Sequence, residues 1–247
     1  MKQLSSNEQK AIEVLEKDHL RNVNLINFIK GYPVRTIDII GDSVMVRGKS
    51  YEDWVYISSN DINEFTSLVE GLTREDNHFA IIESWMVPYL LNTRDVVWNL
   101  SCTKFYLPSY VELPEIKNNI RPLSPGEGTY IYDNYSYRQY VCPDYIEDRI
   151  KNGIALGIYD GNKLVAWIMT HDDGCMGFIN VLPEYRRMGY GIDLACALAN
   201  KIRERGDLVF IHVEDSNMKS LLLARKMGFV EYKEVHWLKT EIKYRQW

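Results

Sequence analysis

Apolar and polar positions in the first half of the chain follow two periods, one typical of helices and one typical of strands. Ser5 and Glu8 form a capping-box pattern that predicts a helix to about residue 17, and a second helix should follow from about residue 19 to Gly31. Gly41-Asp42 lies between two alternating stretches and predicts a hairpin, and Asn60 is the expected cap of an amphipathic helix. Strands are expected at residues 36–40, 43–46, 51–57, 79–82 and 96–106, with a short helix at 85–91.

The second half repeats this order of elements after one extra strand. Strands are expected at residues 120–123, 154–159, 163–171, 176–181, 208–213 and 230–239, and helices at 143–153, 191–205 and 217–227, with one further helix before Pro143. We therefore predict an α/β (α+β) fold with two lobes, each a mixed central sheet flanked by helices. The expected domains are residues 1–110 and 116–247, joined near the proline-rich segment 108–114.

Composition narrows the class of protein. The chain has 247 residues, 46% hydrophobic and 26% charged, and no apolar run long enough to cross a bilayer. Its N-terminus is polar and does not resemble a signal peptide. Its four cysteines have neither metal-ligand spacing nor an evident pairing, which favours thiols in a reducing cytoplasm and no metal. A net charge of -5 argues against nucleic acid as a partner, and no membrane partner is expected.

One stretch, VLPEYRRMGYGI at residues 181–192, carries the clearest chemistry. It runs from an apolar strand into an amphipathic helix that two glycines open. Backbone N–H groups at a helix N-terminus attract anions, and glycine lets a ligand approach the backbone closely, so the stretch suits a pyrophosphate. A P-loop would need Lys-Ser or Lys-Thr where Ile192-Asp193 stands, and a dinucleotide fingerprint would need glycine at Leu194.

Arg186, Gly189 and Gly191, after Val181 and Pro183, match the coenzyme A loop of the GNAT superfamily of acyl-CoA N-acyltransferases. A second element, residues 217–229, resembles the second helix motif of that superfamily, with Asn217 as its cap and Gly228 at its end. The resemblance covers about residues 118–237. It implies a tandem GNAT-like fold and an acyl-CoA co-substrate.

The first half lacks this loop. Residues 58–62, SSNDI, follow its third strand without glycine or arginine, and Asp61 would repel a pyrophosphate. A degenerate N-terminal lobe before an active lobe resembles the glycine N-acyltransferase-like branch of the superfamily. That lobe could form part of an acceptor pocket or serve only to stabilise the protein.

The resemblance also implies a geometry for the site. A bulge near Asn180-Val181 should separate the strand at 176–181 from the strand at 208–213, and the pantetheine arm would enter that gap as a pseudo-strand. The Val181 N–H is expected to polarise the thioester carbonyl. The residues expected to bind the co-substrate are Asn180, Val181, Arg186, Arg187, Met188, Gly189, Tyr190, Gly191, Ile192, Asn217 and Ser220.

Proton transfer decides which catalytic groups to expect. An amine with a pKa near 10.4 costs about 4–5 kcal/mol to deprotonate at pH 7, whereas a leaving thiol with a pKa near 8.5 needs only about 2 kcal/mol of help. A general base should therefore matter more than a general acid. Glu214 and His212 are the candidates, on one face of a strand, although each could instead be a solvated or structural residue. The resemblance implies that a tyrosine usually protonates the leaving thiolate from the position that Ala224 occupies here. Water or Tyr232 would then have to donate that proton.

These observations predict a cytoplasmic N-acetyltransferase that uses acetyl-CoA or another acyl-CoA. A primary amine, on a small molecule or a peptide, would attack the thioester directly in a ternary complex. The protein could be a monomer or a homodimer. An acyl-CoA sensor or scaffold without turnover is the alternative, because Ala224 replaces the usual acid. Transfer from aminoacyl-tRNA is disfavoured by the acidic charge.

Overall fold

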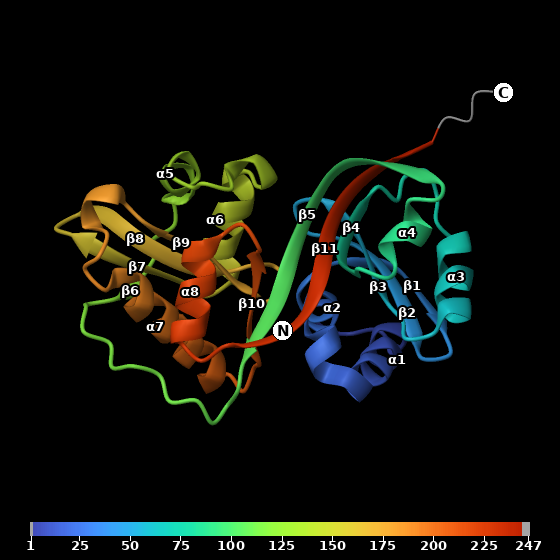
Figure 1. Cartoon of the computed structure of the whole chain (residues 1–247), viewed down its shortest axis with the longest axis horizontal. Coiled ribbons are helices and arrows are strands. Elements are labelled where there is room, and N and C mark those ends of the chain that lie inside the picture. The colour runs from blue at the N-terminus through green and yellow to red at the C-terminus, as the bar shows by residue number, and fades with distance from the viewer. Residues whose placement is uncertain (1, 244–247) are drawn as a thin grey trace. The chain divides into compact units, whose positions relative to one another are not determined.

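The computed structural model describes residues 2–243, which divide into two compact units (Figure 1). Unit 1 consists of residues up to Lys104 together with those from Lys233 onward, and unit 2 consists of Phe105–Tyr232. This division differs from the expected domains 1–110 and 116–247, because the last strand of the chain returns to the first unit. None of the helices among the described residues is both long and apolar enough to span a bilayer.

Unit 1 is a sheet with strand order β1-β2-β3-β4-β11-β5 and helices on both faces. Its elements are α1 (Ser6–Leu15), η1 (Glu16–Asp18), α2 (His19–Gly31), β1 (Val34–Ile40), β2 (Ser43–Lys49), β3 (Asp53–Ser58), α3 (Ile62–Glu70), β4 (His78–Glu83), α4 (Val87–Leu90), β5 (Arg94–Leu107) and β11 (Val230–Ile242). Strands β1 to β3 form an antiparallel meander, and β4 joins β3 in parallel.

Two apolar cores cover the two faces of this sheet. On one face, α1 and α2 bury residues such as Leu15 and Phe28 against Trp54 and other strand residues. On the other face, α3 and α4 bury Phe65 and Leu90 among the side chains that point the opposite way. The capping box at Ser5 and Glu8 is present as expected. The cap of α3 is Asp61, one residue after the expected Asn60.

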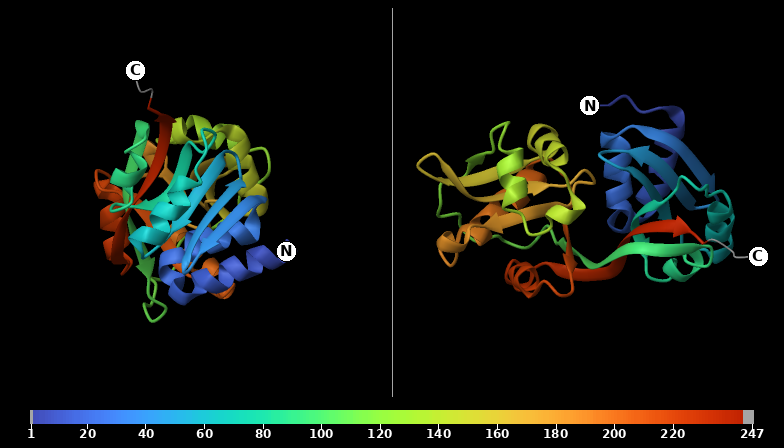
Figure 2. Two further views of the ribbon diagram at one scale, coloured as in Figure 1. Left: turned by 90° about the vertical axis from the view of Figure 1, so that its right-hand side faces the viewer. Right: turned by 90° about the horizontal axis from the view of Figure 1, so that it is seen from above.

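The last strand, β11, lies between β4 and β5, and Figure 2 shows it running beside β5. It pairs antiparallel with β4, with Val235 opposite Glu83 and Leu238 opposite Phe79. Val235 and Leu238 are buried, so the pairing also completes the apolar interior of unit 1. Because a strand sequence does not specify its partner, this placement could not be derived from the order of elements.

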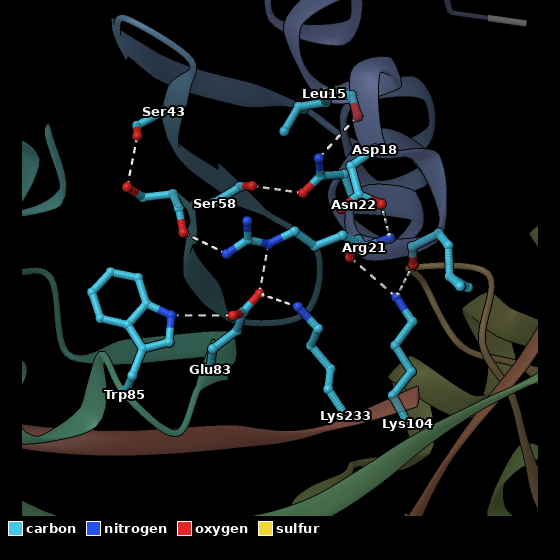
Figure 3. Close-up of polar contacts among 12 residues, drawn as sticks. Leu15, Asp18, Arg21, Asn22, Ser43, Ser58, Glu83, Trp85, Lys104 and Lys233 are labelled. Carbon is cyan, nitrogen blue, oxygen red and sulfur yellow. Dashed lines mark hydrogen bonds and ion pairs between the residues drawn. The ribbon is translucent and has the colours of Figure 1, made fainter. Parts of the chain in front are cut away.

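A buried polar cluster lies beside the ends of β3 and β4 in unit 1 (Figure 3). Arg21 Nε donates to Glu83 at 2.6 Å, and Lys233 Nζ donates to the same carboxylate at 3.0 Å. Trp85 Nε1 donates to its other oxygen at 3.1 Å, and the Arg21 guanidinium also contacts the Ser59 carbonyl. The Glu83 carboxylate is therefore held by two cations and an indole.

Unit 2 has strand order β5-β10-β9-β8-β7-β6, where only the end of β5 belongs to this unit. Its other elements are β6 (Arg121–Pro122), α5 (Gly128–Asp133), η2 (Arg138–Tyr140), α6 (Pro143–Asn152), β7 (Ala155–Asp160), β8 (Lys163–Thr170), β9 (Met176–Val181), η3 (Pro183–Tyr185), α7 (Tyr190–Glu204), β10 (Val209–Glu214) and α8 (Met218–Lys226). Together the units confirm the predicted α+β class, with mixed sheets flanked by helices.

Helix α7 is the main packing element of unit 2. It buries Ala195, Leu198, Ala199 and Ile202 as expected from their spacing, and Gly206 follows its end with φ 78°. Arg203 on this helix donates to the carbonyls of Val111 and Pro108 at 2.9 and 2.8 Å. The proline-rich segment at 108–114 is therefore anchored to unit 2.

Candidate functional site

The loop before α7 leaves the start of that helix open. Arg187 and Gly189 have φ values of 65° and 84°, and no side chain caps α7. A Cβ placed on Gly189 would meet no atom within 4 Å, and Arg186, Arg187, Met188 and Gly189 are exposed. The first N–H groups of a helix have no intrahelical partner, so this junction can receive an anion from solvent.

Strand β9 leads into this loop and contains a bulge. Trp167 on β8 pairs with Asn180, and Met169 pairs with Gly177, so β9 has one extra residue between Gly177 and Asn180. Phe178 within that interval has φ 55°, a left-handed conformation that is strained for a bulky side chain. The bulge expected near Asn180-Val181 is thus present slightly earlier in the strand.

The backbone of Val181 points away from β8. Leu182 N donates to Val165 O at 3.0 Å, which makes Leu182 and Val165 a hydrogen-bonded pair of the antiparallel ladder. Val181 is opposite Ala166, the neighbouring pair, so its N–H and C=O point to the other side of β9, toward β10. Arg186 Nε donates to the Val181 carbonyl at 3.1 Å on that side.

Strands β9 and β10 meet near the start of β9. They are parallel, and the pairing found within the described residues joins Ile211 to Met176, the first residue of β9. The ends of the two strands, at Val181 and Glu214, lie beyond this pair. The gap expected between the two strand ends stays a prediction.

The helix start and the strand end lie next to each other. A Cβ placed on Gly191 would lie 3.9 Å from Val181 Cγ2 and 4.0 Å from Ile179 Cδ1, which is ordinary van der Waals contact. Asp193 in the first turn of α7 is buried, and its Oδ2 accepts from Lys117 N, Asn118 N and Asn118 Nδ2 at 2.8–2.9 Å. These three donors compensate its charge beside the open amides.

A polar cluster is found at the end of β10. Tyr137 Oη donates to Glu214 Oε2 at 2.9 Å, and Asn217 Nδ2 donates to Tyr137 Oη at 3.0 Å. Asn217 caps α8, where its Oδ1 accepts from Ser220 N at 3.1 Å. Glu214, Asn217 and Ser220, all named from the sequence, therefore belong to one hydrogen-bonded group.

Aromatic side chains surround the bulge of β9. The Phe178 ring lies 4.4 Å from His171 and 5.0 Å from Tyr135, measured between centroids. Burial lowers the pKa of His171 to about 3, with a smaller contribution from Arg149, so the imidazole is neutral. Burial also raises the pKa of Tyr135, and its phenol stays protonated. The strained bulge is thus held in a neutral aromatic environment.

The remaining residues named from the sequence lie around this site. Asn180 Nδ2 donates to Asn134 O at 3.2 Å, which occupies its side-chain amide. The Tyr190 ring stacks on Tyr185 at 6.5 Å, and Ile192 is half-buried in the first turn of α7. The His212 ring lies 5.8 Å from Phe210, as expected for alternate residues on one face of β10.

Sequence reasoning missed Tyr137. The signal was present as five tyrosines within residues 130–140, but a tyrosine-rich stretch is more often part of a core. Its contact with Glu214 joins residues 77 positions apart, which no local pattern indicates.

Comparison with known proteins agrees with this geometry. A family model described as FR47-like protein matches residues 153–238, which include β7 to β10, the loop before α7 and Glu214. No curated protein matches the chain in sequence. The X-ray structure of a Drosophila protein aligns with 94% of this chain and 96% of its own, with a TM-score of 0.77 and 17% identity.

Two further solved structures carry descriptions of their class. A putative acetyltransferase from the GNAT family of Novosphingobium aromaticivorans covers 92% of this chain and 100% of its own, with a TM-score of 0.60 and 13% identity. A tandem GNAT protein from the clavulanic acid biosynthesis pathway covers 96% and 97%, with a TM-score of 0.53 and 11% identity. The chain has a tandem GNAT-like fold. Within that fold, unit 2 carries the open helix start at α7, whereas α3 of unit 1 begins with its own side-chain cap.

Proposed function

We propose that the protein is an acyl-CoA-dependent N-acyltransferase that transfers acetyl from acetyl-CoA to a primary amine. The observation that supports this most strongly is the junction of β9 with α7. There, uncapped helix amides, two neighbouring arginines and the outward-facing Val181 N–H lie at the end of β9, beyond the residue pair that joins β9 to β10. The GNAT-like fold supports the same assignment.

Each part of the donor would have a defined partner. The diphosphate would accept hydrogen bonds from the amides of Gly189, Tyr190, Gly191 and Ile192, with Arg186 and Arg187 beside it. The pantetheine arm would add to β9 as a pseudo-strand between β9 and β10. The Val181 N–H would then polarise the thioester carbonyl and stabilise the developing oxyanion.

The acceptor amine would attack the thioester carbonyl directly. Glu214, at the end of β10, is the proposed general base, because it lies beyond the residue pair that joins β10 to β9 and its partner there is a phenol hydroxyl. His212 is the second candidate on the same face of the strand. The nitrogen–carbon bond forms, the carbon–sulfur bond breaks, and coenzyme A leaves as a thiolate.

The two unequal lobes support a finer proposal. We propose that it is similar in role to the glycine N-acyltransferase-like proteins, with unit 1 as the lobe without a donor site and with a small-molecule or peptide amine as acceptor. A cytoplasmic location fits the use of acetyl-CoA.

Thiol release from acetyl-CoA tests the proposed function. The acceptors are hydroxylamine, which is neutral at pH 7 and needs little recognition, and a panel of primary amines that includes glycine, benzylamine, spermidine and a short peptide. We expect thiol release above the enzyme-free rate with at least one of these, together with formation of the acetylated amine. Binding of acetyl-CoA without thiol release with any acceptor would instead establish an acyl-CoA sensor or scaffold.

A further inference from the structure

The segment after α5 contacts the ends of β9 and β10 in unit 2. At one end, the Asn134 carbonyl accepts from Asn180 Nδ2 at 3.2 Å, beside Val181 at the end of β9. Three residues later, Tyr137 Oη contacts Glu214 at the end of β10 and Asn217 at the start of α8. A single short segment therefore reaches both strands between which we place the acyl donor.

The hydrogen bonds of Tyr137 set the direction of its proton. Its hydroxyl accepts from the Asn217 amide and donates to the Glu214 carboxylate, so the phenol proton is directed at Glu214 while that group is ionised. If Glu214 takes up a proton, the carboxylic acid can donate to Tyr137 Oη instead. The phenol proton is then free to point toward another acceptor.

Ala224 leaves the role of proton donor to another group. This residue, at the position where a tyrosine is usual in the family, is 2% exposed and has no proton to give. Tyr232, considered from the sequence, lies at the start of β11. Tyr137 comes from a different part of the fold, between α5 and η2, and lies against the proposed base.

On the basis of the proposed function, we infer that Tyr137 protonates the departing thiolate and that Glu214 restores its proton. Glu214 removes a proton from the attacking nitrogen as the tetrahedral intermediate forms. When the carbon–sulfur bond breaks, the sulfur takes the proton of the Tyr137 hydroxyl. The Glu214 carboxylic acid gives its proton to Tyr137 Oη, so one proton has moved from nitrogen to sulfur and both side chains return to their starting states.

The relay also solves an energetic problem. Transfer from a phenol with an ordinary pKa near 10 to a thiolate whose acid has a pKa near 8.5 is uphill by about 1.5 pK units. Transfer from an ordinary carboxylic acid, with a pKa near 4.3, to the same thiolate is downhill by about four. The 2.9 Å contact couples the two transfers, so the favourable loss of the proton from the carboxylic acid offsets the unfavourable loss of the proton from the phenol.

The test changes the leaving group and the hydroxyl together. We would measure kcat and KM with hydroxylamine as acceptor, using acetyl-CoA and acetyl-seleno-CoA, whose selenolate leaves without a proton. The variant is Tyr137→Phe. The matched control is Tyr140→Phe, which removes a hydroxyl from the ring that stacks on Tyr137 at 6.5 Å. Calorimetry with coenzyme A checks that each variant keeps its donor site.

We expect Tyr137→Phe to lower kcat with acetyl-CoA by about 10- to 100-fold and to leave KM and coenzyme A affinity unchanged. With acetyl-seleno-CoA the loss should shrink to about threefold or less. Tyr140→Phe should behave as the unmodified protein does with both donors.

An equal loss of kcat with both donors would overturn the relay, because it would mean that Tyr137 only positions Glu214. Unchanged kcat with acetyl-CoA would overturn it as well. Either result leaves the acyltransferase assignment intact, since the unmodified protein still turns over. Absence of thiol release by the unmodified protein would overturn the proposed function itself, and the relay with it.

Discussion

The helices that follow β3 and β9 occupy the same place in the order of elements of the two units, but they begin differently. In unit 1, Asp61 caps α3, and its Oδ1 accepts from Asn63 N at 2.7 Å and Glu64 N at 3.0 Å. In unit 2, Gly189 precedes α7 and supplies no side-chain cap. A helix start that holds its own carboxylate cannot also hold a diphosphate, whereas an uncapped start with exposed glycine can.

The strands before these helices differ in the same direction. Strand β3 pairs with β2 without interruption from Asp53 to Ser58, whereas β9 has an extra residue opposite β8 and a left-handed Phe178. Unit 1 does contain a left-handed apolar residue, Ile81, but it lies in β4. Ile81 also lies at a register shift, opposite β11, so unit 1 has a bulge of the same kind but not in the strand that precedes α3. In unit 2 the bulge is in the strand that leads to the open helix start.

Glutamates at the ends of β4 and β10 complete the comparison. Glu83 is bound by Arg21 and Lys233, while Glu214 accepts from the hydroxyl of Tyr137. A carboxylate between two cations is part of a structural ion-pair network, and a carboxylate beside a phenol can exchange a proton with it. Equivalent positions have therefore taken a structural role in one unit and a proposed chemical role in the other.

The largest expected effect is on the rate after a change at Glu214. Glu214→Gln should lower kcat with a primary amine at pH 7 by about 100-fold, because the amine must then lose its proton without a base. At pH 9 the free-amine fraction is about 100-fold larger, so the loss should shrink. A ratio of wild-type to variant kcat that stays constant from pH 7 to pH 9 would remove Glu214 as the base.

The equivalent change in unit 1 should affect stability. Glu83→Gln leaves Arg21 and Lys233 without their carboxylate, and we expect a loss of about 3 kcal/mol in the free energy of unfolding. Asp53→Asn, which breaks the exposed ion pair with Arg35, is the control and should cost about 0.5 kcal/mol or less. Urea denaturation measures both, and equal stability of the two variants would mean that the Arg21 cluster does not hold β4 in place.

The smallest expected effect is at the cap of α3. Asp61→Ala removes the acceptor for Asn63 N and Glu64 N and should lower the free energy of unfolding by about 1 kcal/mol. Asp61→Asn keeps a cap oxygen and should be close to wild type. If thermal denaturation shows no difference between these two variants, the helix start of unit 1 does not depend on a side-chain cap oxygen at residue 61.

Much of the fold followed from the sequence because local signals specify it. The capping box at Ser5, the glycine turn at Gly41 and the apolar spacing of α7 each correspond to an element in the structure. The partner of β11 did not follow, because its pairing with β4 joins residues about 150 positions apart. The position of the bulge was displaced for a related reason, since tertiary packing around Phe178 imposes its left-handed backbone.

The part of the candidate site that consists of backbone amides and glycines could be predicted from the sequence. The loop before α7 combines a sequence motif with a local conformation, and its residues lie together as expected. Tyr137 could not be found this way, because its role depends on contact with a distant strand end.

Calorimetric titration with acetyl-CoA tests most directly whether the start of α7 binds the donor. A Cβ at Gly191 makes only ordinary contacts, so Gly191→Asp should fold normally while placing a carboxylate where the diphosphate would lie. Gly31→Asp is the matched control, because a Cβ there meets no atom within 4 Å and the residue lies at the end of α2 in unit 1. The account predicts binding to the wild-type protein and to Gly31→Asp, and none to Gly191→Asp. Equal affinity for all three proteins would contradict it.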